Sequence, residues 1–240
     1  MPTNDCLTYL QTLLAMDVDA HRYRSGKKVS QPPPLVITIS RDYGAGGELL
    51  GRSLSQCLGI PIYDREILRL IAERSKSTEF HVELQDEAVT SGLTSFIFST
   101  ITGTTSHMAV YRRVLYDVVM DLSKHDAILI GRGAHLILGT RKVFRIRVIA
   151  SPETCAERVA AEEAISAAEA ERKVKQTNEQ RHQSIQRLFS DHYKQCSLEN
   201  AHNFDLVLNT DQIPPDQAAP VILMGLRQAG FDLYQERKAV

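Results

Sequence analysis

Residues 39 to 54, ISRDYGAGGELLGRSL, place three glycines between an apolar run and a segment with helical spacing. A strand, a glycine-rich loop and a helix in this order hold phosphate groups in many nucleotide-binding proteins. Gly44, Gly46 and Gly47 would let backbone N–H groups turn toward an anion at the N-terminus of the helix. The stretch therefore suggests a phosphate site, although glycines after a buried strand can also serve only a tight turn.

The loop departs from the usual phosphate-binding pattern G-x-x-x-x-G-K-[ST]. Laid on residues 41 to 48, the pattern fits only at Gly46. Arg41 stands at the first glycine, Gly47 at the lysine and Glu48 at the hydroxyl residue. The missing lysine normally binds the β- and γ-phosphates. Because Arg41 is the cation best placed in the sequence, we expect it to take over that contact.

Charged residues also follow two other strand-like runs. Asp64 comes directly after IPIY, and Arg132 follows AILIG with a glycine on either side. Ligands of parallel α/β sheets bind at the carboxyl edge, where both residues would lie. An isolated arginine usually occupies a solvated surface position, but one in a loop that can approach a ligand suits phosphate recognition.

A polar helical region near residues 167 to 188 carries five basic side chains. Their simplest explanation is a solvated helix face with ion pairs to nearby glutamates. The alternative is a mobile basic lid that closes over transferring phosphates. The five are Arg172, Lys173, Lys175, Arg181 and Arg187.

Five short apolar runs predict strands, and helical segments separate them. The runs are residues 35–40, 60–63, 127–131, 144–150 and 204–209, and the clearest helical segments are 65–75, 108–124 and those starting at Ser151 and Ser166. Strands that are apolar on nearly every residue are typical of parallel sheets covered on both faces. The alternation therefore predicts an α/β fold, with a five-stranded parallel sheet and helices on both faces.

The chain divides at Pro32-Pro33-Pro34, because triple proline is stiff and extended. Residues 1–34 would form an N-terminal helix and a proline-rich linker, and residues 35–240 the main domain. The short apolar stripe of the helix suggests an attachment for a protein partner or for self-association.

The composition of the 240 residues is that of an ordinary globular protein, with 43% hydrophobic and 24% charged residues. A net charge of −1 gives no general attraction to nucleic acid or to an anionic membrane, so we expect neither as a partner. The four cysteines form no C-x-x-C pair, and the N-terminus has no basic region typical of a signal peptide. We expect reduced thiols and a cytoplasmic location.

Several stretches together resemble the successive motifs of the cytidylate-kinase-like proteins, a divergent branch of the P-loop nucleoside monophosphate kinases. The resemblance runs from about residue 35 to 230, in motif order as well as content. It implies an ATP-binding glycine loop, a helical insertion for the monophosphate at about 64–126 and a helical lid at about 165–200. The stretches are ITISRDYGAGGELLGRSLSQCLGIPIYDREIL, ILIGRGAHLIL, FRIRVIASPETCAERV, TNEQR and FDLVLNTDQI.

The resemblance also implies roles for individual residues. Asp64 and Arg132 would bind the acceptor, and Arg41, Arg132 and Arg181 would be catalytic. ATP and Mg²⁺ would be the cofactors, with no protein residue assigned as a metal ligand. The donor would bind at Arg41, Tyr43, Gly44, Ala45, Gly46, Gly47, Glu48 and Leu49.

Three positions depart from the pattern of this branch. Glu48 replaces a typical arginine, Gly133 replaces the aspartate of Gly-Arg-Asp, and Asn178 replaces a lid aspartate. Leu49 also offers no hydroxyl to Mg²⁺. Three functions therefore stay open: an ATP-dependent kinase acting on CMP or dCMP, a regulatory protein that binds a nucleotide with little or no turnover, and a small-molecule kinase with a non-nucleotide acceptor.

Overall fold

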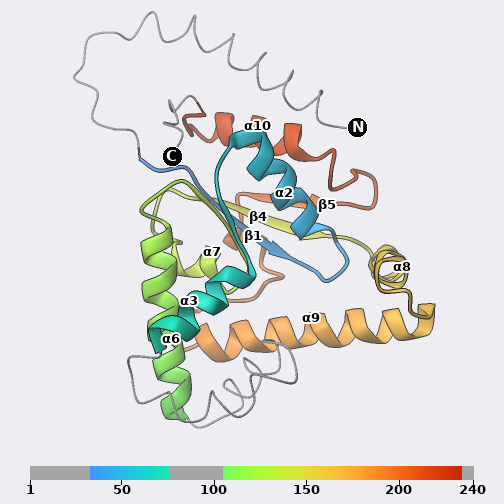
Figure 1. Cartoon of the computed structure of the whole chain (residues 1–240), viewed down its shortest axis with the longest axis horizontal. Helices are drawn as coiled ribbons and strands as arrows, with labels where there is room; N and C mark the ends of the chain where they lie inside the picture. Colours follow the sequence, from blue (N-terminus) through green and yellow to red (C-terminus); the bar gives the residue numbers. More distant parts are fainter. Residues whose placement is uncertain (1–32, 76–104, 234–240) are drawn as a thin grey trace, which may run out of the picture.

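The computed structural model describes residues 33–75 and 105–233, which form a five-stranded sheet covered by helices (Figure 1). The strand order is β2-β3-β1-β4-β5, and every neighbouring pair is parallel. The predicted sheet is confirmed, and the predicted bounds agree within two residues. The strands are β1 (Val36–Arg41), β2 (Ile62–Tyr63), β3 (Ala127–Ile130), β4 (Phe144–Ile149) and β5 (Leu206–Asn209).

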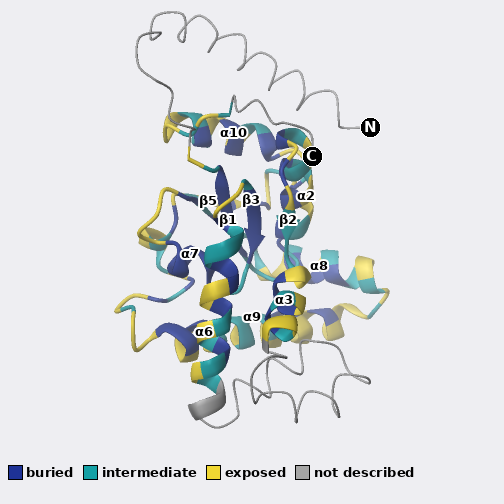
Figure 2. Cartoon of the chain, turned by 60° about the vertical axis from the view of Figure 1, so that its left-hand side comes forward, coloured by how far each residue is buried: buried dark blue, intermediate teal, exposed yellow. Residues whose placement is uncertain are grey.

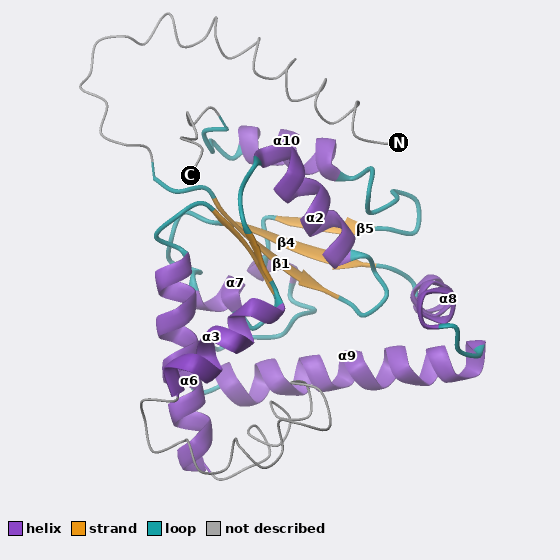
Figure 3. Ribbon diagram, in the orientation of Figure 1, coloured by secondary structure: helices purple, strands orange, loops and turns teal. Residues whose placement is uncertain are grey.

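Helices pack on both faces of the sheet (Figure 3). One face carries α2 (Gly47–Leu58), α8 (Pro152–Glu163) and α10 (Ala219–Gln228), whose apolar side chains form one buried cluster with the sheet. The other face carries α3 (Arg65–Ser75), α6 (Thr105–Leu122) and α7 (Ala134–Ile137), which form a second cluster. Figure 2 shows the buried residues in dark blue, along the strands and on parts of the helices around them. A short 3-10 turn, η2 (Ala201–Asn203), precedes β5.

The helix ends follow the capping residues in the sequence. Gly59 closes α2 in the left-handed conformation that glycine tolerates best, with φ of 62°. Ser151 caps α8 through its hydroxyl, which accepts the Thr154 N–H at 3.2 Å. Ser166 likewise accepts the Glu169 N–H at 3.3 Å and starts the next helix. Gly59 therefore fixes where α2 ends, and the two serines fix where α8 and α9 begin.

The long helix α9 (Ala167–Phe189) crosses beneath the sheet and contacts both clusters. Ala170 and Val174 pack in the first cluster, and Ile185, Leu188 and Phe189 pack in the second. Only these five of its 23 residues are buried, as expected of a helix that is polar around most of its circumference. Its apolar residues gather near its two ends, so no continuous stripe marks them in the sequence.

Part of the sequence prediction lies outside the described residues. This holds for the proposed N-terminal helix and for residues 76–104 of the proposed insertion. Cys57 takes part in a disulfide, so the expectation of reduced thiols is wrong for this residue, while Cys155 and Cys196 are free and buried. Among the described residues, no helix is long and apolar enough to span a membrane.

Candidate active site

The glycine loop joins β1 to α2 with two residues in the left-handed region. Gly44 has φ of 84° and Gly46 has φ of 80°. The Leu50 N–H donates to the Gly46 carbonyl at 3.0 Å and begins the helical hydrogen bonding. The N–H groups of the first helical turn before it have no carbonyl acceptor within the helix, as at any helix N-terminus. The loop therefore presents donors suited to an anion.

Arg41 ends β1, and its side chain lies against Gly47. A Cβ placed on Gly47 would come within 2.6 Å of the Arg41 Cβ and 2.7 Å of its Cγ. Further out, Arg41 Nη1 would be 2.5 Å from a Cβ on Gly131. The guanidinium thus extends along the glycine loop toward the end of β3. It occupies the space beside the position where the usual pattern has a lysine.

Two carboxylates contact the Arg41 guanidinium. Arg41 Nε donates to Glu48 Oε1 at 2.7 Å, and Nη2 lies 2.6 Å from the same oxygen. Arg41 Nη2 also donates to Asp64 Oδ1 at 3.3 Å. Burial raises the pKa of Glu48, but attraction to Arg41 and Arg181 outweighs it, and the pKa lies below its ordinary value. Glu48 is therefore ionised at neutral pH.

Arg132 forms no hydrogen bond or ion pair with any residue that the structure describes. Desolvation lowers its pKa, and Arg41 lowers it further, while Tyr111 and Asp64 oppose the shift. Its backbone φ of 56° is left-handed, a region that costs a non-glycine residue about 1–2 kcal/mol. A partly desolvated guanidinium without a carboxylate partner among the described residues is a group that an anionic ligand would stabilise.

The surroundings of Gly133 explain why the loop after β3 has a glycine where the family pattern has an aspartate. A Cβ at this position would lie 2.3 Å from Phe189 Cε2 at the end of α9. Gly133 also has φ of 68°, which disfavours any side chain. The change from Gly-Arg-Asp to Gly-Arg-Gly is therefore required by the packing of α9.

Arg181 approaches the same region from α9. Its Nη1 donates to the Arg41 carbonyl at 3.0 Å, and its guanidinium lies 5.5 Å from the centre of the Tyr43 ring. Burial first, and then the charges of Arg41 and Arg132, lower the pKa of Arg181 to about 10. Three predicted arginines from three separate elements thus affect one another electrostatically. We call Arg41, Arg132 and Arg181 the arginine cluster.

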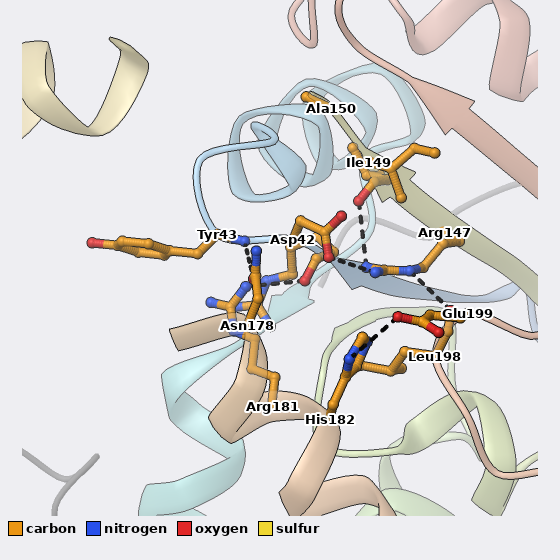
Figure 4. Close-up of polar contacts among 12 residues, drawn as sticks. Asp42, Tyr43, Arg147, Ile149, Ala150, Asn178, Arg181, His182, Leu198 and Glu199 are labelled. Atoms are coloured by element: carbon orange, nitrogen blue, oxygen red, sulfur yellow. Dashed lines mark hydrogen bonds and ion pairs between the residues drawn. The ribbon is translucent and has the colours of Figure 1, made fainter. Parts of the chain in front are cut away.

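Tyr43 of the glycine loop makes hydrogen bonds to both α9 and α8. The Tyr43 N–H donates to Asn178 Oδ1 at 2.8 Å (Figure 4). The Tyr43 hydroxyl donates to Glu163, which also pairs with Lys173. Burial and this hydrogen bond raise the pKa of Tyr43 to about 12. Asn178, which looked like the loss of an acidic lid residue, therefore positions the start of the loop.

The sequence analysis missed one ion pair beside the loop. Arg147 of β4, with only 5% of its side chain exposed, donates to Asp42 and also to the Leu198 carbonyl at 3.2 Å (Figure 4). A buried arginine in a central strand needs such partners. The signal was present, because FRIRVIA places two arginines in an otherwise apolar strand. We infer that the pair fixes the first residue of the loop.

A cleft of about 850 Å³ is lined by residues of β4, β5, α8 and α9, and by Asp42. None of the cluster residues lines it. Its lining has more carboxylates than cations, which disfavours a phosphate ligand. The charged residues of the lining are Asp42, Arg147, Glu153, Glu171, Lys175, Glu179 and Glu199. We therefore place the candidate site at the arginine cluster.

The remaining predicted residues lie at or near this site. Ala45 is fully buried, and its carbonyl accepts the Thr210 hydroxyl at 2.9 Å. Asp64 lies at the site because it accepts a hydrogen bond from Arg41. Leu49 is 45% exposed on the first turn of α2. Its predicted part in donor binding has the least support.

Comparisons with known proteins place the fold and the family of the chain. A search of curated proteins finds no significant match. An uncharacterized protein from Eubacterium ventriosum ATCC 27560 matches with 15% identity and a TM-score of 0.59, over 80% of this chain and 98% of that one. TT1252 from Thermus thermophilus matches with 18% identity and a TM-score of 0.50, over 81% and 98%.

Shikimate kinase from Bacteroides thetaiotaomicron matches with 15% identity and a TM-score of 0.45, over 81% of this chain and 98% of that one. At these identities, the uncharacterized protein and TT1252 show a shared fold only. The sequence itself matches the model of the cytidylate kinase-like family over residues 36–212, which is well over half of the chain. The chain belongs to the cytidylate kinase-like family.

Proposed function

We propose that the protein is a phosphotransferase that moves the γ-phosphoryl group of ATP to a nucleoside monophosphate, CMP or dCMP. The observation that carries this proposal is the convergence of Arg41, Arg132 and Arg181 at the N-terminus of α2. Phosphoryl transfer depends mainly on positioning and on neutralising negative charge. A cluster of this kind, beside the backbone N–H groups at the start of α2, would supply both.

Each arginine would meet a different part of the reactants. The loop amides and Arg41 would hold the donor phosphates, because both lie at the start of α2. Arg132 would bind the acceptor phosphate, since it has no acidic partner among the described residues. Arg181 lies close to the Arg41 backbone and would stabilise charge that develops between donor and acceptor.

ATP and Mg²⁺ are the cofactors that we propose. Among the described residues, no group of three or more His, Cys, Asp or Glu side chains could hold a metal ion. The two carboxylates on Arg41, Glu48 and Asp64, are the available oxygen ligands. Mg²⁺ commonly binds one or two carboxylates together with substrate phosphates, so the residues fit an ion that arrives with the nucleotide. Bound there, it would neutralise phosphate charge.

A nucleotide-binding regulatory protein is the second candidate. It is favoured by the two carboxylates that already occupy Arg41, because a phosphate would have to displace them. A partner or self-association through residues 1–34 belongs to the same candidate, and those residues lie almost wholly outside the described part. For either function we propose a cytoplasmic location, which the two free cysteines support and the disulfide at Cys57 opposes.

The test is ADP release from ATP with a panel of nucleoside monophosphates, with and without Mg²⁺. We expect Mg²⁺-dependent ADP release with CMP or dCMP. Arg132→Ala should abolish most of it, while Arg187→Ala on the exposed face of α9 should not. Nucleotide binding without ADP release would instead support the regulatory protein. Release with a non-nucleotide acceptor alone would support the small-molecule kinase.

A further inference from the structure

The guanidinium of Arg41 is already engaged by two carboxylates. Glu48 Oε1 lies 2.7 Å from Nε and 2.6 Å from Nη2, so one oxygen takes both donors on one side of the group. Asp64 takes a single, longer contact of 3.3 Å. A phosphate oxygen bound by Arg41 would use these same N–H groups. Glu48 thus occupies the position on Arg41 that a donor phosphate would need.

We propose that Glu48 determines specificity: it competes with the donor phosphates for Arg41 and so makes nucleotide binding depend on a divalent cation. The inference rests on the proposed function. It gives a role to Glu48, which stands at a position where the family typically has an arginine. In this account the carboxylate is exchanged for a phosphate oxygen when the nucleotide binds, and no covalent bond forms or breaks.

The charges at the site give the reason. Three guanidinium groups face the two carboxylates Glu48 and Asp64, so the cluster keeps one excess positive charge. A metal-free triphosphate carries several negative charges, and the displaced Glu48 stays beside it as a further one. A divalent cation reduces this repulsion, and carboxylate and phosphate oxygens are its preferred ligands. The metal-bound nucleotide should therefore bind far better than the free one.

The position of Glu48 allows the exchange. Glu48 lies in the first turn of α2, where the helix dipole favours a negative charge. This holds both when the carboxylate contacts Arg41 and after a phosphate has displaced it. Its side chain is 36% exposed, against 11% for Arg41, so it has room on the solvent side. Asp64 makes only one contact with Arg41, and we expect it to contribute less.

Calorimetric titration of the full chain with a non-hydrolysable ATP analogue, with Mg²⁺ or with EDTA, tests the inference. The variants are Glu48→Gln, which keeps the shape and removes the charge, and Glu157→Gln on the exposed face of α8 as the control. Glu48→Gln should bind the metal-free analogue about tenfold more tightly or better, a change of about 1.4 kcal/mol or more. Binding of the metal-bound analogue should not tighten, because the variant also lacks a carboxylate that we propose as a Mg²⁺ ligand.

The ratio of the two affinities decides the outcome. It should shrink about tenfold in Glu48→Gln and stay at the wild-type value in Glu157→Gln. An unchanged ratio in Glu48→Gln overturns the inference and leaves the proposed function standing. Absence of binding by the wild type at millimolar analogue, with and without Mg²⁺, overturns both. Thermal melts confirm that each variant is folded before titration.

Discussion

The Arg41 side chain leaves the end of β1 directly against the Cα of Gly47, so that no Cβ fits at residue 47 without displacing Arg41. The position that usually carries the phosphate-binding lysine is therefore closed by the arginine that we propose as its replacement. The glycine at residue 47 and the position of Arg41 depend on each other, because the Arg41 Cβ and Cγ occupy the space that a side chain at residue 47 would need. A lysine cannot be restored at residue 47 while Arg41 keeps this conformation.

We accordingly predict that Gly47→Lys does not raise nucleotide affinity. Gly47→Ala and Gly47→Lys should each lower the free energy of unfolding by about 1–3 kcal/mol, as overpacking does. Urea unfolding measures this. Gly225→Ala is the comparison and should cost less, since its Cβ would meet only a ring atom of Phe144 at 3.1 Å and helix propensity favours alanine. A Gly47→Lys variant with full stability and tighter ATP binding would contradict the assignment of Arg41.

Arg132 should serve anion binding at a cost in stability. Its φ of 56° is unfavourable for arginine, so Arg132→Gly should raise the free energy of unfolding by about 1 kcal/mol, or the melting temperature by about 2–4 °C. The same change should weaken binding of CMP about tenfold or more, because a charge-assisted contact is worth about 1.5–3 kcal/mol. Melting curves and calorimetry measure the two effects.

Ala164 provides the matched control for Arg132. It is the other non-glycine residue with positive φ in the described part of the chain, at 54°, and it ends α8 away from the arginine cluster. Ala164→Gly should stabilise the protein by a similar amount and leave CMP affinity unchanged. Loss of stability in Arg132→Gly, with CMP affinity intact, would show that Arg132 is a structural residue.

Asn178 should hold the glycine loop through its side-chain oxygen. Asn178→Ala removes the acceptor of the Tyr43 N–H and should cost about 0.5–1.5 kcal/mol of stability. Asn178→Asp keeps an acceptor and should retain most of it, which urea unfolding can measure. Gln176→Ala, at an exposed position of the same helix, should be close to neutral. Equal losses in Asn178→Ala and Asn178→Asp would show that the hydrogen bond is unimportant.

The sequence predicts the fold better than the site. Runs such as LVITI bury every residue in a parallel sheet, so their pattern alone predicts the strands and their parallel direction. The convergence of Arg41, Arg132 and Arg181 was predicted only through a family resemblance, because residues from β1, a loop and α9 meet through tertiary packing. The partners of these residues could not be predicted. Glu48 departs from the residue typical of the family, and its pairing with Arg41 could not be read from that departure.

The roles of Gly133 and Asn178 show the same limit. Both looked like losses when compared with the family pattern. Gly133 is required by contact with Phe189, and Asn178 by its hydrogen bond to Tyr43, and each involves α9 packing against a distant loop. Local spacing carries no information about such contacts.

A buried histidine should make the stability depend on pH. His135 Nδ1 lies 3.1 Å from the Ser40 hydroxyl, and burial, then Arg147 and Arg145, lower the pKa of His135 to about 3. An unfolded histidine has a pKa of about 6.5, so between these values only the unfolded state binds the proton, and stability falls as the pH falls. This should cost about 2 kcal/mol between pH 7 and pH 5. In urea unfolding, the free energy of unfolding of His135→Asn should fall by about 2 kcal/mol less than that of the wild type over this pH range. The exposed His202→Asn should keep the wild-type pH dependence. The same pH dependence in all three proteins would mean that His135 is protonated in the folded state.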